Sequence, residues 1–206
     1  MTPLPVIAKV CQVVSKTLDQ VIGGRGDTPL LVATACAEAL KSLNIGAQVW
    51  YGKAAWVEVL DDQSAVWAGA WGAEEFHFWT VTEFHETVDL YVSQSSKKKG
   101  VHPLGELKPL YSPPILWSSE IPKFYRYHSE GIAEIDRDAA EAGAYLEKIL
   151  ERIRKHCRPE LLDEAAPQFP NESIICPDRK LMDDIQGSFR FYERAILVHG
   201  IPAAPF

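Results

Sequence analysis

A histidine and an aspartate in the middle of the chain have the spacing of a proton-transfer pair. The segment FHFWTVTEFHETVDLYVSQ, residues 76–94, has the pattern of a strand, a turn and a returning strand. Side chains alternate along strands, so a hairpin that pairs residue 77 with residue 89 places His77 and Asp89 side by side. A buried carboxylate fixes the tautomer of an imidazole and stabilises its protonated form, as a general base requires. A register shifted by one residue would move Asp89 to the opposite face.

The nucleophile that such a pair would activate is Cys36. A reactive cysteine needs a lowered pKa, commonly from a helix N-terminus and a nearby imidazolium. Cys36 lies two turns into an expected helix, on its apolar face, so a buried core thiol is the alternative interpretation. Thr28, at the start of that helix, carries only a hydroxyl, which ionises far less easily than a thiol.

Two further interpretations of these residues stay open. His77 can be a structural histidine whose hydrogen bonds are satisfied inside the fold. His77, His85 and Asp89 can be imagined as metal ligands, but the sequence offers no fourth ligand at a recognised spacing. We therefore expect neither a metal nor a cofactor.

The order of these motifs resembles the transglutaminase-like branch of the papain-like cysteine peptidase superfamily. That group has a cysteine at the start of a helix, then an L-G-I-x-A-x-V-x-x-G pattern, then H-x-W and D-[LF]-[TS] on successive strands. The corresponding elements of this chain are LNIGAQVWYG at 43–52, His77-Phe78-Trp79, and Asp89-Leu90 with Gln94 following. The likeness spans residues 24–94.

The resemblance implies a bacterial protein with a papain-like α+β fold and a Cys-His-Asp site for amide, ester or isopeptide bonds. Cys36 would attack the acyl carbon, His77 would act as base and then as acid, and Asp89 would orient His77. Counting back from residue 43 to the position of the family's cysteine leads to Thr28-Pro29, which carries no thiol. The alternative is therefore a catalytically inactive relative that uses the cleft to bind a ligand or a protein. The distance from a cysteine sulfur to His77 separates the two.

The helices and strands that must position these residues are expected to form an α+β fold. In it, N-terminal helices pack on an antiparallel sheet and C-terminal helices close its other side. Apolar residues at helical spacing predict helices over 5–21, over 29–43 with Thr28 as N-cap and Pro29 as first residue, over 136–156 and over 180–198. Segments rich in valine and aromatic residues predict strands between 45 and 92: AQVWYG, AAWVEVL, AVWAGAW, EFHFWTV and TVDLYVS. Residues 94–123 are expected to form a long connection. A single domain over 1–206 is the expected organisation.

The overall composition excludes several classes of partner. The formal net charge is −7 and the pI is about 5.4, so nucleic acid and anionic membranes would be repelled. No signal peptide and no apolar run long enough for a membrane span are evident, and the four cysteines form no CxxC pair. These features predict a cytoplasmic protein whose partner is a small molecule or a peptide.

Overall fold

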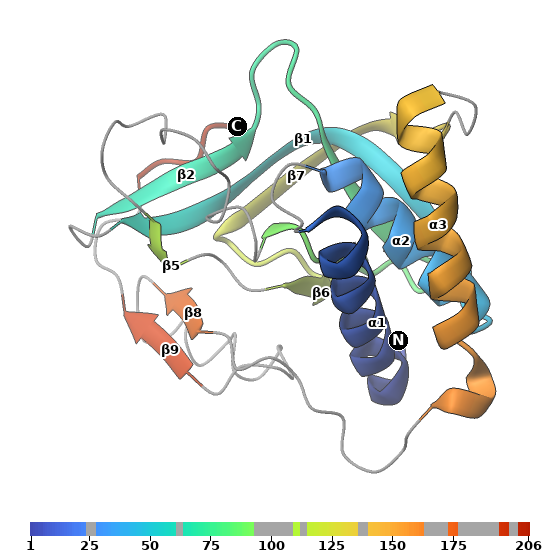
Figure 1. Ribbon diagram of the computed structural model, residues 1–206. Helices are drawn as coiled ribbons and strands as arrows, with labels where there is room; N and C mark the ends of the chain where they lie inside the picture. The colour runs from blue at the N-terminus through green and yellow to red at the C-terminus, as the bar shows by residue number, and fades with distance from the viewer. Residues whose placement is uncertain are drawn as a thin grey trace.

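The computed structural model describes residues 1–23, 28–60, 64–92, 109–111, 115–135, 140–162, 173–176, 194–197 and 202–206. They form an α+β fold in which three α-helices gather on one side of a curled, mainly antiparallel sheet (Figure 1). The α+β prediction is confirmed at this level.

The first two helices lie where apolar spacing predicts them. Helix α1 spans Leu4–Ile22 and ends at Gly23, whose φ of 72° is the left-handed conformation that glycine adopts readily. Helix α2 spans Pro29–Ser42, with Thr28 at the N-cap position. Their apolar faces are buried: Val6, Val10, Val14 and Leu18 on α1, and Val32, Cys36, Ala39 and Leu40 on α2. Within the described residues, no helix combines the length and the apolar content of a membrane span.

A single long strand, β1 (Ala47–Leu60), organises the main sheet. The sequence predicts two segments here, AQVWYG and AAWVEVL, but the chain continues through Gly52 without a break. At Gly52 the partner strand approaches so closely that a Cβ atom would overlap the carbonyl oxygen of His128. Glycine therefore marks a bulge in the pairing of a continuous strand.

Strands β2 (Ala65–Ala70) and β3 (His77–Thr82) both run antiparallel to β1. Ala70 pairs with Ala54 and His77 pairs with Gly52, so the two strands lie end to end along β1. Residues 71–76 leave the sheet between them; we call this segment the excursion, and it is the tall loop above β1 in Figure 1.

Four further strands complete this sheet. Strand β4 (Thr87–Asp89) pairs with β3, and β6 (Leu116–Ser118) pairs with β4. Strands β7 (Tyr125–Ile132) and β5 (Pro109–Tyr111) pair with β1. The predicted connection over 94–123 thus contains β5 and β6, and β7 was not predicted.

The third helix, α3 (Ala140–His156), contradicts one part of the expected architecture. It packs on α1 and α2, with Arg154 Nε donating to Glu38 Oε1 of α2 at 2.5 Å, so it does not close the other side of the sheet. Its buried residues Leu146, Ile149, Leu150 and Ile153 form one helical stripe, which explains this packing. A short 3₁₀ turn follows at Pro159–Leu161.

The last predicted helix, over 180–198, is wrong at residues 194–197. These form strand β9 (Arg194–Leu197), which pairs in parallel with β8 (Ser173–Cys176). Short aliphatic runs such as RAIL fit a strand as well as a helix, and a neighbouring strand decides between the two. Residues 180–193 and 198 lie outside the described residues.

Candidate functional site

His77 and Asp89 meet in the structure, although not as direct cross-strand partners. Strands β3 and β4 pair Thr80 with Val88 and Val81 with Thr87, a register that sets Trp79, not His77, opposite Asp89. The offset from the expected pairing is two residues, so both side chains stay on one face. His77 Nε2 lies 2.6 Å from Asp89 Oδ2, and both residues are 2% exposed.

The carboxylate of Asp89 is the centre of a buried network. Its Oδ1 accepts a hydrogen bond from the Tyr91 backbone N–H at 2.9 Å. Its Oδ2 is shared by the His77 ring and by the hydroxyl of Tyr127, which donates at 2.7 Å. We call His77, Asp89 and Tyr127 the buried triad after its two buried members, His77 and Asp89; Tyr127 is partly exposed. Because three donors converge on it, the carboxylate is well compensated for its removal from water.

Tyr127 responds to this environment electrostatically. Burial raises the pKa of its hydroxyl well above 10, and the nearby charge of Asp89 and the hydrogen bond to it raise it further. The tyrosine therefore stays a neutral donor. Its proton serves to hold the carboxylate, not to leave in a reaction at ordinary pH.

Aromatic rings surround His77. Those of Trp56 and Tyr91 have centroids 5.2 Å from the imidazole, and those of Trp79 and Tyr127 lie at 6.4 Å. Trp56 and Tyr91 are themselves buried, at 3% and 5% exposure. His77 thus sits among aromatic rings that shield its hydrogen bond with Asp89 from water.

Cys36 lies in the interior of α2 and is 1% exposed. The thiol is therefore away from the first turn, where the helix dipole would lower its pKa, and is closed to solvent. Helix α2 covers the face of β3 that carries Thr80, whose hydroxyl donates to the Ala33 carbonyl at 2.8 Å. Alternation along β3 points His77 to the opposite face.

Thr28 occupies the N-cap position of α2 without capping it. Its Oγ1 is shielded from solvent and makes no hydrogen bond with any residue that the structure describes. Ala33 contacts Thr80, and Gly46, just after α2, accepts a hydrogen bond from the Glu83 N–H. The N-terminus of α2 is therefore directed toward the His77 end of β3.

The metal interpretation receives no support from the geometry. His85 is exposed, in the turn between β3 and β4 with a φ of 58°, whereas His77 and Asp89 are buried. Among the described residues, no group of three or more His, Cys, Asp or Glu side chains is arranged to hold a metal ion.

Sequence reasoning missed Tyr127 because it missed β7. The signal was present in YRYHSEGI, where Tyr125 and Tyr127 alternate with polar Arg126 and His128. Tyr125 is fully buried and Tyr127 joins the triad, so this alternation identifies the inward face of a strand.

Comparisons with known proteins add little. No family model matches the sequence, and no curated protein matches it. One crystal structure, of a genomics target, is similar with a TM-score of 0.43 and 14% sequence identity, over 82% of this chain and 84% of that chain. A likeness at this level indicates neither a family nor a function.

Proposed function

We propose that this protein is a catalytically inactive relative of the transglutaminase-like thiol enzymes, and that it acts by binding. The observation that carries the proposal is the buried triad, in which His77 is sealed among aromatic rings and Asp89 accepts hydrogen bonds on both oxygens. Such an arrangement suits a structural centre better than a site that admits an acyl substrate.

Three features support the relationship to these enzymes. The helix N-terminus at Thr28, the H-x-W motif at 77–79 and the D-L motif at 89–90 follow one another in the family's order. Helix α2 packs on β3 with its N-terminus toward the end of the strand at which His77 lies, while the imidazole points to the other face of the sheet. His77 and Asp89 are within hydrogen-bond distance, as an imidazole and its orienting carboxylate must be.

Two features support inactivity. A threonine stands where the resemblance implies a cysteine, and its hydroxyl lacks the easy ionisation of a thiol. Cys36, the nearest alternative, is 1% exposed and lies within the core between α2 and its neighbours. A thiol enclosed in this way cannot reach an acyl carbon without opening the fold.

The test is thiol labelling of the native protein with iodoacetamide from about pH 5 to about pH 9, with each cysteine followed by mass spectrometry. Cys157 is an internal reference for an unreactive thiol, because burial raises its pKa to about 12, although nearby Lys9 opposes the shift. We expect Cys36 to label as slowly as Cys157 in the native protein and rapidly after denaturation.

A His77→Ala variant sharpens this test. If Cys36 labels rapidly below its reference pKa of about 8.5, and if this reactivity disappears in His77→Ala, the thiol is activated and the proposal is wrong. Equal, slow labelling in both native proteins supports inactivity.

A further inference from the structure

A groove between α1 and α3 lies outside the region discussed above. Its volume is about 220 Å³, and eight residues line it: Lys9, Gln12, Val13, Lys16, Thr17 and Gln20 from α1, and Arg152 and His156 from α3. Val13 and Thr17 are 8% and 4% exposed and form a solid floor, while the longer polar side chains form the walls. The groove is therefore supported by packed helices.

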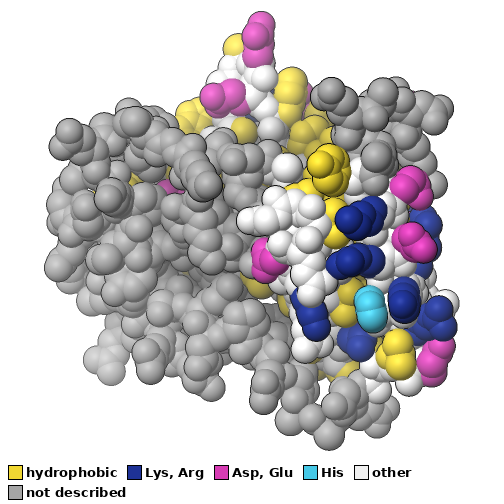
Figure 2. All heavy atoms as spheres, viewed as in Figure 1, with side chains coloured by type: hydrophobic (Ala, Val, Ile, Leu, Met, Phe, Trp, Pro, Cys, Tyr) yellow, Lys and Arg dark blue, Asp and Glu magenta, His cyan; other side chains and the backbone are white. Residues whose placement is uncertain are grey.

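The charge of this groove opposes that of the whole chain. Two lysines, an arginine and a histidine line it, and none of its described lining residues is acidic, whereas the protein carries a net charge of −7. Figure 2 shows Lys and Arg side chains gathered around a histidine on this face of the molecule. A cationic site on an acidic protein concentrates anions locally, against the overall field.

The dipole of α3 accounts for only some of the basic residues around the groove. Basic residues in the last turn of α3, Arg154, Lys155 and His156, complement the negative end of its dipole. Lys9 and Lys16 belong to the body of α1, however, seven residues apart on the face that meets α3. Arg152 Nη1 donates to Gln20 Oε1 of α1 at 2.8 Å, which holds the guanidinium across the groove.

We propose that the α1–α3 groove binds a small phosphate-bearing ligand. A guanidinium presents a planar fork of N–H donors that matches phosphate oxygens, and lysines add point charges around it. The volume corresponds to about seven waters, below the roughly 300–1,000 Å³ of sites for drug-sized ligands. The ligand is therefore a compact one, of the size of one or two phosphate groups with few further atoms.

Isothermal titration calorimetry of the full chain with inorganic pyrophosphate, at low ionic strength, tests the proposal. We expect saturable binding with one site per chain. In a Lys16→Gln/Arg152→Gln double variant the dissociation constant should rise more than about tenfold, because both charged donors are removed. Thermal unfolding of this variant checks that it folds.

Lys155→Gln is the matched control. It removes one positive charge from the same helix, at an exposed residue that is not part of the groove. We expect this variant to bind within about twofold of the wild type. Equal weakening by Lys155→Gln and by single Lys16→Gln would mean general charge attraction, and the proposal would be wrong. The proposal would also be wrong if pyrophosphate shows no saturable binding. Binding of an acidic peptide in place of pyrophosphate would contradict it in the same way.

Discussion

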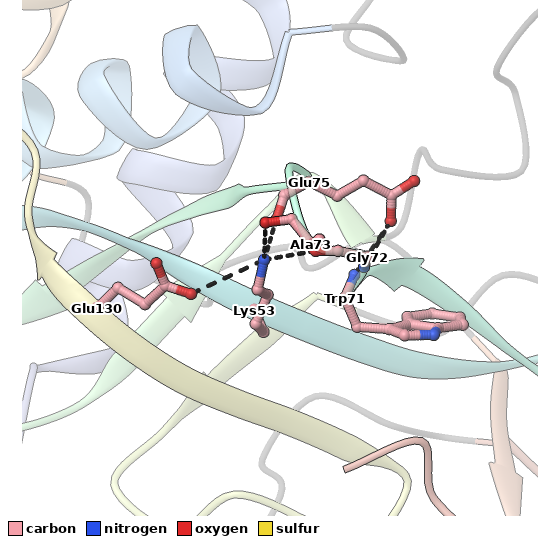
Figure 3. Close-up of polar contacts among 6 residues, drawn as sticks. All are labelled: Lys53, Trp71, Gly72, Ala73, Glu75 and Glu130. Atoms are coloured by element: carbon pink, nitrogen blue, oxygen red, sulfur yellow. Dashed lines mark hydrogen bonds and ion pairs between the residues drawn. The ribbon is translucent and has the colours of Figure 1, made fainter.

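Two polar clusters flank one point of β1, and they differ in how their charge is held. The buried triad stands over Gly52, which pairs with His77, whereas Lys53 points to the opposite face and into the excursion. Lys53 Nζ donates to the carbonyls of Gly72, Glu75 and Ala73 at 2.5, 2.9 and 3.4 Å, and Glu130 Oε1 lies 3.8 Å away (Figure 3).

The difference lies in access to water. The side chains of His77 and Asp89 are 2% and 1% exposed, while those of Lys53 and Glu130 are 18% and 34% exposed. A buried charge that loses its partner cannot recruit water, whereas a half-exposed one can. Similar hydrogen-bond lengths in the two clusters therefore correspond to unequal contributions to stability.

The largest effect is expected for Asp89→Ala. This change leaves His77 and Tyr127 without their buried acceptor, and we expect the free energy of unfolding to fall by about 3–5 kcal/mol. Urea denaturation measures this directly, with Glu130→Gln as the exposed control, expected within about 0.5 kcal/mol of the wild type. A loss below about 1 kcal/mol for Asp89→Ala would mean that the triad contributes little to stability.

A smaller effect is expected for Tyr127→Phe, which removes one donor to Asp89 and should cost about 1–2 kcal/mol at neutral pH. It should also change the alkaline pH dependence. The tyrosine pKa is near 10 when unfolded and well above that when folded, so its contribution is complete below pH 10 and declines as the pH rises toward the folded value. Unfolding free energies from about pH 8 to about pH 11 should decline less steeply in the variant. Identical slopes would contradict the role of Tyr127.

The partly exposed cluster around Lys53 should respond locally. Lys53→Met removes the donor that joins three carbonyls of the excursion, at an expected cost of about 0.5–1 kcal/mol. Amide hydrogen exchange should accelerate in residues 71–76 and stay unchanged at Tyr91, which donates to Asp89. Equal acceleration at both places would show that the clusters are coupled, contrary to their separation by the sheet.

The smallest effect is expected at Thr28, which belongs to neither cluster. Because its buried hydroxyl makes no hydrogen bond with the described residues, Thr28→Val should leave stability within about 0.5 kcal/mol or raise it slightly. Where a threonine side chain does cap a helix, the same change lowers the free energy of unfolding by about 1 kcal/mol. Thermal unfolding distinguishes the two results.

Local patterns predicted the first three helices well, but not the last. Valines four residues apart, a glycine stop and a Thr-Pro start located α1 and the beginning of α2, because these signals act within a few residues. They also placed His77 and Asp89 on one face, since alternation in a hairpin depends on parity alone.

Long-range pairing could not be predicted in the same way. The continuity of β1 through Gly52 depends on β7, and the place of α3 depends on the apolar stripes of two other helices. Tyr127 reaches Asp89 from 38 residues away. No local sequence pattern indicates that Tyr127 and Asp89 come together across this separation, or that Tyr127 shares its acceptor with His77.

The excursion offers a practical consequence. Ala54 pairs with Ala70 on one side of it and Gly52 pairs with His77 on the other, so β1 aligns both flanks whatever joins them. A foreign peptide could replace residues 71–76 and be displayed from the rim of the sheet, with its ends already fixed. Evolution can use the same position to lengthen the protein without disturbing the histidine that follows.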